Sequence, residues 1–202
     1  MVRPSLRLVA CVIGVLTLTA GVRAVNTAPP ARPDTLTFRL ADTTGAVHTE
    51  RELAAATAVV LFFVAPDCPI SQGYVPEMNR IAQAYAARGV RVFGVQSDLT
   101  ASATEVSRHV ADYKYAFPVL NDRQQVLVAH TGVTVTPEAV LMTRAGALLY
   151  RGRIDNRIVT LGIRRPEATQ FDLRSAVDAT LAGQAPAFTR TTAIGCSIVR
   201  AR

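Results

Sequence analysis

Cys68 is the residue whose type and setting point most clearly to chemistry. It follows an uninterrupted run of apolar, β-forming residues (57–64) and stands just before Pro69, which suits the first turn of a helix. The unpaired N–H groups and partial positive charge of a helix N-terminus favour a thiolate, which is the nucleophilic form of cysteine. Asp67 opposes the thiolate by like charge unless its side chain points away. Cys68 is therefore a candidate nucleophile, and the alternative is a buried cysteine that only packs.

Cys196 is the only other cysteine that follows Ala24. Three interpretations of it stay open: a thiol that resolves whatever Cys68 has captured, half of a static disulfide, or a tail thiol without a role. The long separation of the two cysteines in sequence does not decide among them, because contact depends on the fold. If Cys196 resolves Cys68, oxidation yields a Cys68–Cys196 disulfide within or between chains.

Apolar patterning predicts an α/β domain with a central mixed sheet flanked by helices. Residues 57–64 have the pattern of a strand buried on both faces, residues 71–88 show helical spacing, and residues 90–95 form the next strand. The remaining patterns predict strands at 35–40, 117–120, 138–142 and 148–151, helices at 104–113, 124–130 and 172–181, a connection at 47–56 and a polar loop at 152–166. Residues 184–202 are expected to form an extended tail that carries Cys196.

The N-terminal segment, residues 1–24, has the features of an export signal. Two arginines stand near the start, residues 8–20 form an apolar run, and Val22-Arg23-Ala24 offers a cleavage site flanked by small residues. Lipidation at Cys11 and an uncleaved anchor are the alternatives. Residues 25–34 are rich in proline and small residues and are expected to form a flexible leader. The mature protein is thus expected in the periplasm or outside the cell, without a stable membrane span, where disulfides persist.

Charge and metal-ligand spacing argue against two classes of function. The formal net charge is +7, but the arginines that follow Ala24 are scattered, and nucleic-acid binding requires clustered positive charge. His48, His109 and His130 do not stand at metal-ligand spacing with a cysteine, and His109 and His130 are expected to be solvated or capping residues. No metal site and no organic cofactor are expected.

The segment FFVAPDCPISQGYVPEMNRI (residues 62–81) resembles the active-site strand and helix of the thioredoxin superfamily. It is most similar to the redoxin branch, which groups alkyl hydroperoxide reductase/thiol-specific antioxidant proteins with exported thioredoxin-like proteins. Pro76 stands where relatives have a helix-bending proline, and Thr136-Pro137 matches the cis-proline position. Residues 117–122 and the Gly195-Cys196 segment also resemble a peroxiredoxin-like subgroup. The resemblance implies that residues 35–183 form one thioredoxin-like domain.

Two departures from the family pattern bear on the reaction. Thioredoxins have Cys-x-x-Cys, whereas Ser71 occupies the second position here and cannot close a disulfide. Peroxiredoxins have a proline and a threonine or serine before the cysteine, and these positions are Leu61 and Ala65 in this chain. The copper chaperones of the same fold use two cysteines in the same local motif, of which only Cys68 is present.

The resemblance and the residues together predict an exported thiol oxidoreductase with Cys68 as its nucleophile. The expected partners are protein thiols or disulfides, or small peroxides, together with an external thiol reductant. Resolution is expected from Cys196 or from that external thiol. The groove around the helix N-terminus is expected to be lined by Asp67, Pro69, Ser71, Thr136 and Pro137. The alternatives are a redox-inert binding protein of the same fold and, less favoured, a copper chaperone.

Overall fold

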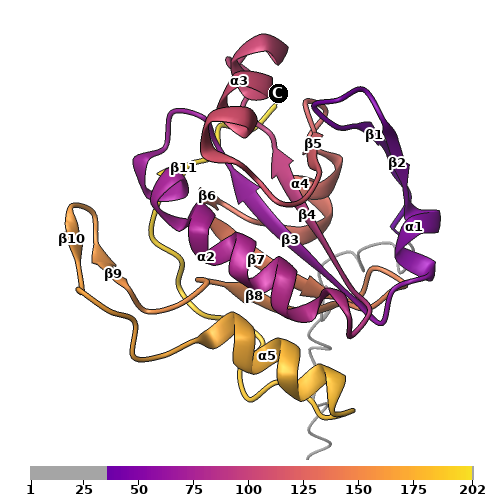
Figure 1. Cartoon of the computed structure of the whole chain (residues 1–202), viewed down its shortest axis with the longest axis vertical. Coiled ribbons are helices and arrows are strands. Elements are labelled where there is room, and N and C mark those ends of the chain that lie inside the picture. The colour runs from indigo at the N-terminus through magenta and orange to yellow at the C-terminus, as the bar shows by residue number, and fades with distance from the viewer. Residues whose placement is uncertain (1–35, 202) are drawn as a thin grey trace, which may run out of the picture. The chain divides into compact units, whose positions relative to one another are not determined.

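A five-stranded mixed sheet forms the centre of the computed structural model, which describes residues 36–201 (Figure 1). The expected signal segment and leader lie outside the described residues. The strands stand in the order β5-β4-β3-β7-β8, with bounds β3 (Ala58–Val64), β4 (Val90–Gln96), β5 (Val119–Asn121), β7 (Glu138–Met142) and β8 (Leu148–Gly152). β3, β4 and β5 are parallel, whereas β7 and β8 join antiparallel. The predicted mixed sheet is thus confirmed.

All seven residues of β3 are buried, because helices cover both of its faces. Phe62 and Val64 pack in one apolar cluster with residues of α2 and α5, and Leu61 and Phe63 pack in the other with residues of α1 and α4. The helices are α1 (Glu50–Ala54), α2 (Pro69–Ala86), α3 (Ala103–Tyr113), α4 (Val126–Thr131) and α5 (Asp172–Leu181). Within residues 36–201, no helix is both long enough and apolar enough to cross a membrane.

The short elements depart from the sequence-based prediction. The expected connection at 47–56 contains β2 (Val47–Thr49), paired with β1 (Arg39–Ala41), and the helix α1. The expected polar loop at 152–166 contains a hairpin of β9 (Ile158–Thr160) and β10 (Ile163–Arg164). The expected extended tail contains β11 (Cys196–Ser197), paired with β6 (Val135–Thr136). Such short strands are too brief to show periodicity, so pattern reasoning does not detect them.

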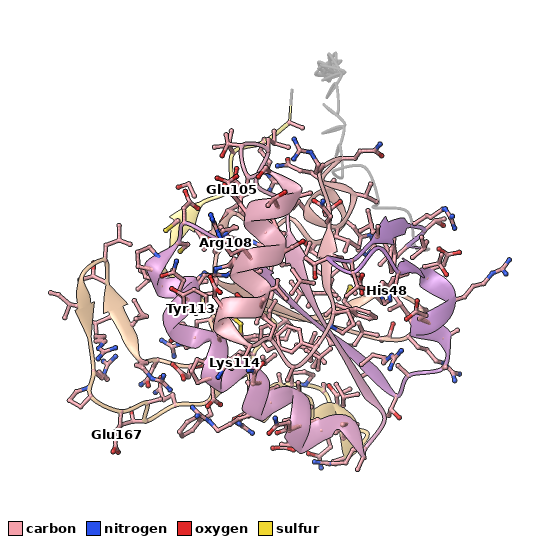
Figure 2. The ribbon with its side chains drawn as sticks, turned by 45° about the horizontal axis from the view of Figure 1, so that its top comes forward. His48, Glu105, Arg108, Tyr113, Lys114 and Glu167 are labelled. Atoms are coloured by element: carbon pink, nitrogen blue, oxygen red, sulfur yellow. The ribbon has the colours of Figure 1, made fainter. Side chains whose placement is uncertain are left out.

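His48 lies on β2 and is buried between the carboxylates of Asp42 and Glu52 (Figure 2). Its Nε2 lies 3.1 Å from Asp42 and its Nδ1 lies 3.1 Å from Glu52, so one ring joins the hairpin to α1. Burial lowers the pKa of His48, but hydrogen bonds and charges from these two carboxylates outweigh it and raise the pKa above its usual value. The expectation of a solvated or capping histidine is wrong for His109, which is buried and bonds the Tyr115 hydroxyl.

We expect His48→Gln to lower the free energy of unfolding by about 1 kcal/mol near pH 6, and by less near pH 9. The folded-state pKa is raised, so the charged ring stabilises the fold fully below its unfolded pKa of about 6.5. That stabilisation is lost as the pH rises through the raised pKa. Urea unfolding of both proteins at the two pH values measures the difference, and an equal loss at both would contradict the assignment.

Candidate active site

Cys68 lies in the turn between β3 and α2, directly before the first residue of α2. The Cys68 amide donates to the Ala65 carbonyl at 3.3 Å, which closes the turn. The Cys68 carbonyl accepts from the Gln72 amide at 3.0 Å, and this is the first hydrogen bond of the helix. Pro69 occupies the first position of α2, where a missing N–H costs nothing. The predicted strand end and helix start are therefore present, and the Cys68 side chain is fully buried.

The second wall of the site is β6 and the peptide bond that follows it. The Thr136–Pro137 bond is cis, as the resemblance implies. The Cys68 thiol donates to the Thr136 carbonyl at 3.0 Å, so this segment faces the sulfur directly. Both Thr136 and Pro137 are buried.

The C-terminal residues 189–201, which we call the strap, bring Cys196 to this wall. β11 pairs antiparallel with β6, and the pairing sets Cys196 opposite Thr136 and Ser197 opposite Val135. The Ile198 amide extends the pairing by donating to the Thr134 carbonyl at 2.9 Å. Cys68 and Cys196, which are far apart in sequence, thereby become neighbours in one chain.

Anchors on both sides of Cys196 hold the strap. On its C-terminal side, the Gln125 side chain donates to the Val199 carbonyl at 2.6 Å and accepts from the Ala201 amide at 2.9 Å. The Arg200 guanidinium donates to the carbonyl of Val133. On the N-terminal side, the backbone of Arg151 bonds both Thr189 and Thr191. Cys196 is therefore fixed at the site without a long free segment on either side.

Gly195 allows the strap to approach β6 this closely. A β-carbon built at this position would overlap the Thr136 carbonyl group and would come within 3.1 Å of the Pro137 nitrogen. Both of these are backbone atoms and have little freedom to yield. Glycine is thus the residue type that this close approach accepts.

The pKa of Cys68 is set by burial and by hydrogen bonds that oppose it. Burial raises the pKa, because a thiolate is poorly solvated in the interior. The thiol of Cys196 lowers the pKa most, followed by the amide of Ser71, the nearby Thr136 hydroxyl and the amide of Cys196. The lowering interactions outweigh burial, so the pKa of Cys68 lies below its usual value.

The pKa of Cys196 moves in the opposite direction. Burial raises it first, and the hydrogen bond and charge of Cys68, with a smaller effect of the Asp67 charge, raise it further to about 12. When the pair of thiols has lost one proton, the remaining proton therefore resides on Cys196. Cys68 is the group that ionises, and Cys196 is the group that keeps its proton and donates a hydrogen bond.

Two hydroxyl groups of residues that contact Cys68 are not committed elsewhere. Ser71 Oγ and Thr136 Oγ1 are buried and have no well-formed hydrogen bond to other atoms of the described chain. Buried hydroxyls ordinarily have such partners. These two are free to donate toward the Cys68 sulfur or toward an atom bound to it. Asp67, in contrast, is exposed beside the turn.

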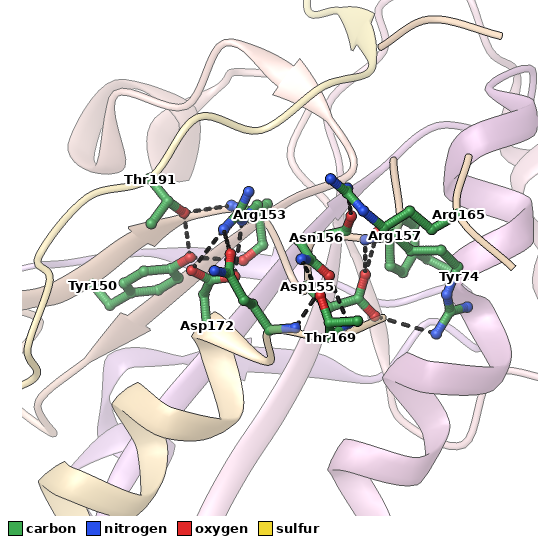
Figure 3. Close-up of polar contacts among 11 residues, drawn as sticks. Tyr74, Tyr150, Arg153, Asp155, Asn156, Arg157, Arg165, Thr169, Asp172 and Thr191 are labelled. Atoms are coloured by element: carbon green, nitrogen blue, oxygen red, sulfur yellow. Dashed lines mark hydrogen bonds and ion pairs between the residues drawn. The ribbon is translucent and has the colours of Figure 1, made fainter. Parts of the chain in front are cut away.

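A polar network behind the site joins α2 to the segment after β8 (Figure 3). The Asp155 carboxylate is buried, accepts from the Tyr74 hydroxyl at 2.6 Å and pairs with Arg157 at 3.2 Å. The position of Arg153 and Asp155 directly after a predicted strand favours a surface salt bridge or turn, but Asp155 is buried. Arg153 instead pairs with Asp172, at 2.8 Å.

The same network reaches the strap. The Tyr150 hydroxyl donates to the Arg153 carbonyl at 2.7 Å and lies 2.5 Å from the Thr191 hydroxyl, which also accepts from the Arg153 amide. Sequence reasoning missed these anchors, as well as Gln125 and Gly195. The one available signal was the Gly-Cys pair, because glycine beside a cysteine suggests a close backbone approach.

The described residues contain no group of three or more histidine, cysteine, aspartate or glutamate side chains that would hold a metal ion. A cavity of about 390 Å³ borders the Cys68 turn at Pro66 and Asp67. It lies between Asp67 and α3, where Glu105, Arg108 and Tyr113 form part of its wall (Figure 2). The site is thus built from two thiols, two hydroxyls and backbone groups.

Solved structures resemble this chain over most of its length. A hypothetical protein from Sinorhizobium meliloti is 30% identical, with a TM-score of 0.71 over 80% of this chain and 90% of its own. An uncharacterized conserved protein from Geobacillus kaustophilus is 26% identical, with a TM-score of 0.72 over 82% of this chain and 89% of its own. DsbF of Mycobacterium tuberculosis, solved in mixed oxidized and reduced forms, is 26% identical, with a TM-score of 0.50 over 57% of this chain and 84% of its own.

No curated protein matches the sequence. Residues 33–153, more than half of the chain, match the AhpC/TSA family. The match includes Cys68, Thr136 and Pro137 but ends before the strap, so Cys196 lies outside it. The fold, the cis peptide bond and this match together place the chain in the AhpC/TSA family of thioredoxin-fold redoxins.

Proposed function

We propose that this protein is an exported thiol oxidoreductase in which Cys68 is the nucleophile and Cys196 is the resolving thiol. The observation that carries the proposal is the placement of the two thiols side by side with opposed pKa shifts. A redox-inert binding protein has no need to lower the pKa of one cysteine with the thiol of another. The likeness to DsbF, which was solved in oxidized and reduced forms, supports the same class of chemistry.

The reaction with a peroxide proceeds in two steps. The Cys68 thiolate attacks one peroxide oxygen, the O–O bond breaks, and Cys68 becomes a sulfenic acid while the second oxygen leaves as an alcohol or water after protonation. Cys196 then attacks the Cys68 sulfur, the S–O bond breaks, and water leaves with the formation of a disulfide. Two equivalents of an external thiol restore both cysteines and become a disulfide themselves.

Attack on a disulfide substrate follows the same order of residues. The Cys68 thiolate displaces one substrate thiolate and forms a mixed disulfide, which Cys196 then resolves. The burial of Cys68 beneath the strap favours a small oxidant over a polypeptide disulfide, because a polypeptide has to displace β11 before it reaches the sulfur. We therefore infer that a small peroxide or other small oxidant is the first electron acceptor.

The free hydroxyls of Ser71 and Thr136 fit this chemistry. An oxygen atom bound to the Cys68 sulfur needs hydrogen bonds in a buried site, and these hydroxyls have no well-formed bonds to other described residues. They offer donors in a chain that lacks the peroxiredoxin threonine, whose position is Ala65. Export is supported by the basic start and apolar run within residues 1–24, and an oxidising compartment lets the disulfide persist.

One equivalent of hydrogen peroxide is expected to convert the reduced protein to an intrachain Cys68–Cys196 disulfide. Cys196→Ser is expected to stop at a sulfenic acid on Cys68. Cys68→Ser is expected to leave Cys196 reduced, because burial, the largest cause of the raised pKa of Cys196, persists in this variant. Peptide mapping by mass spectrometry distinguishes these products. A wild-type protein that shows neither a disulfide nor a sulfenic acid would contradict the proposed activity.

The rate at which peroxide consumes the Cys68 thiol is expected to rise with pH and to level off below about pH 8.5, the usual thiol pKa. The rate follows the thiolate fraction, and the pKa of Cys68 is lowered. Cys196→Ala removes the strongest hydrogen bond that lowers this pKa, so its profile should shift to higher pH. Identical midpoints in the two proteins would show that Cys196 does not tune the nucleophile.

Gly195→Ala is expected to slow the closure of the Cys68–Cys196 disulfide by about tenfold or more, because the added methyl group pushes the strap away from β6. Gly73→Ala is the matched control, since a methyl group on this α2 glycine meets no atom within 4 Å. Acid quenching and alkylation at timed intervals after peroxide addition measure both rates. Equal closure rates would refute the role given to the close approach.

A further inference from the structure

The hairpin of β9 and β10 with its connecting loop (residues 158–164), which we call the arm, has no part in the chemistry above. It stands apart from the five-stranded sheet in Figure 1, next to the end of α2 that follows Cys68. Val159, Leu161 and Ile163 on the arm are 44%, 64% and 59% exposed. Three large apolar side chains in one short exposed hairpin indicate a contact surface, because apolar surface left in water costs free energy.

A groove of about 190 Å³ separates the arm from the first turns of α2. Pro69, Ile70 and Tyr74 line it on the helix side, and Ile158 and Ile163 line it on the arm side. Pro69 directly follows Cys68, so a chain seated in the groove comes next to the active-site turn. Tyr74 is held by Asp155 at 2.6 Å, which gives the groove a fixed wall.

The charge of the groove is positive. Residues 157–165 contain three arginines and no acidic residue, and none of the groove-lining residues is acidic. Arg157 is neutralised by Asp155, and Arg165 donates to the Asn156 carbonyl. Arg164, at the groove, is exposed and supplies positive charge to an incoming chain. The complementary ligand is therefore both apolar and acidic.

The arm also has main-chain groups to offer. Its two strands pair only with each other in the described chain, so each has an outer edge. An extended peptide binds such an edge through backbone hydrogen bonds and places alternate side chains against the neighbouring surface. The strap fills the edge of β6, whereas the edges of the arm stay open.

We propose that the groove docks the cysteine-bearing segment of a protein thiol reductant, an extended segment with apolar and acidic residues beside its cysteine. The proposal rests on the proposed function, in which the Cys68–Cys196 disulfide needs an external thiol. The docked thiolate attacks Cys196, which is partly exposed, and the S–S bond breaks with Cys68 leaving as a thiolate. A second thiol then attacks the mixed disulfide, releases Cys196, which takes up a proton, and is oxidised with the first.

Two synthetic peptides of equal length, each with one cysteine, test the docking. One has leucine and glutamate around the cysteine, and the other has serine and lysine. The first should reduce the oxidised wild-type protein about tenfold faster than the second. Arg164→Glu should abolish or reverse this preference, and Ile163→Ser, which removes an apolar side chain from the groove wall, should slow the first peptide to the rate of the second. Dithiothreitol should reduce all variants at the same rate.

Arg144→Glu and Phe188→Ser are the matched controls, because they make the same kinds of change at exposed residues that do not line the groove. Both should keep the wild-type preference. Equal rates with the two peptides, or a preference that survives the arm variants, would overturn the docking proposal while leaving the disulfide chemistry intact. A protein that forms no Cys68–Cys196 disulfide would overturn both proposals. A wild-type dimer in sedimentation velocity that the arm variants dissociate would assign the arm to a second copy instead.

Discussion

A thiolate stabilised in a water-excluded site is the constraint on which the rest of this structure depends. Cys68 is fully buried, and burial alone would keep it protonated and unreactive. The chain meets this cost with donors drawn from three places: the start of α2, the wall formed by β6, and the thiol of Cys196. Only the donor at the start of α2 is close to Cys68 in sequence, so the reactive state of one sulfur also depends on distant parts of the domain.

The strap meets a second requirement, that of holding two sulfurs in contact while they remain separate thiols. A disulfide needs its two α-carbons within about 7 Å, and here main-chain pairing provides the approach. Gly195 permits the close contact, and Gln125 and Thr191 fix the chain on either side of it. In the proposed function, Cys196 from the C-terminal end of the domain thus takes the place of the second cysteine of the thioredoxin motif.

The large elements could be predicted from the sequence because each has a clear pattern. The apolar run 57–64 must be covered on both sides, and Cys68 before Pro69 fits a helix start, so the sheet and the candidate nucleophile follow from local chemistry. The pairing of β11 with β6, which brings Cys196 to the site, could not be derived from the sequence. β11 is very short, and its pairing depends on backbone groups that are distant in sequence. The burial of Asp155 was missed for a related reason, since its environment comes from Tyr74, on a helix much earlier in the chain. The family match likewise ends at residue 153, before the strap begins.

β11 pairs with the edge of β6 through backbone hydrogen bonds, as extended peptides bind the sheet edges of many proteins. The strap therefore acts as a peptide ligand that is covalently part of the same chain. A tethered ligand acts at an effective concentration on the order of millimolar, however dilute the protein is. A free peptide at micromolar concentration therefore has no mass-action advantage at the edge of β6. A molecule that binds the edge of β6 must first break the contacts of Gln125 and Arg200 that hold the strap. Dilution of the protein does not release the strap from this edge.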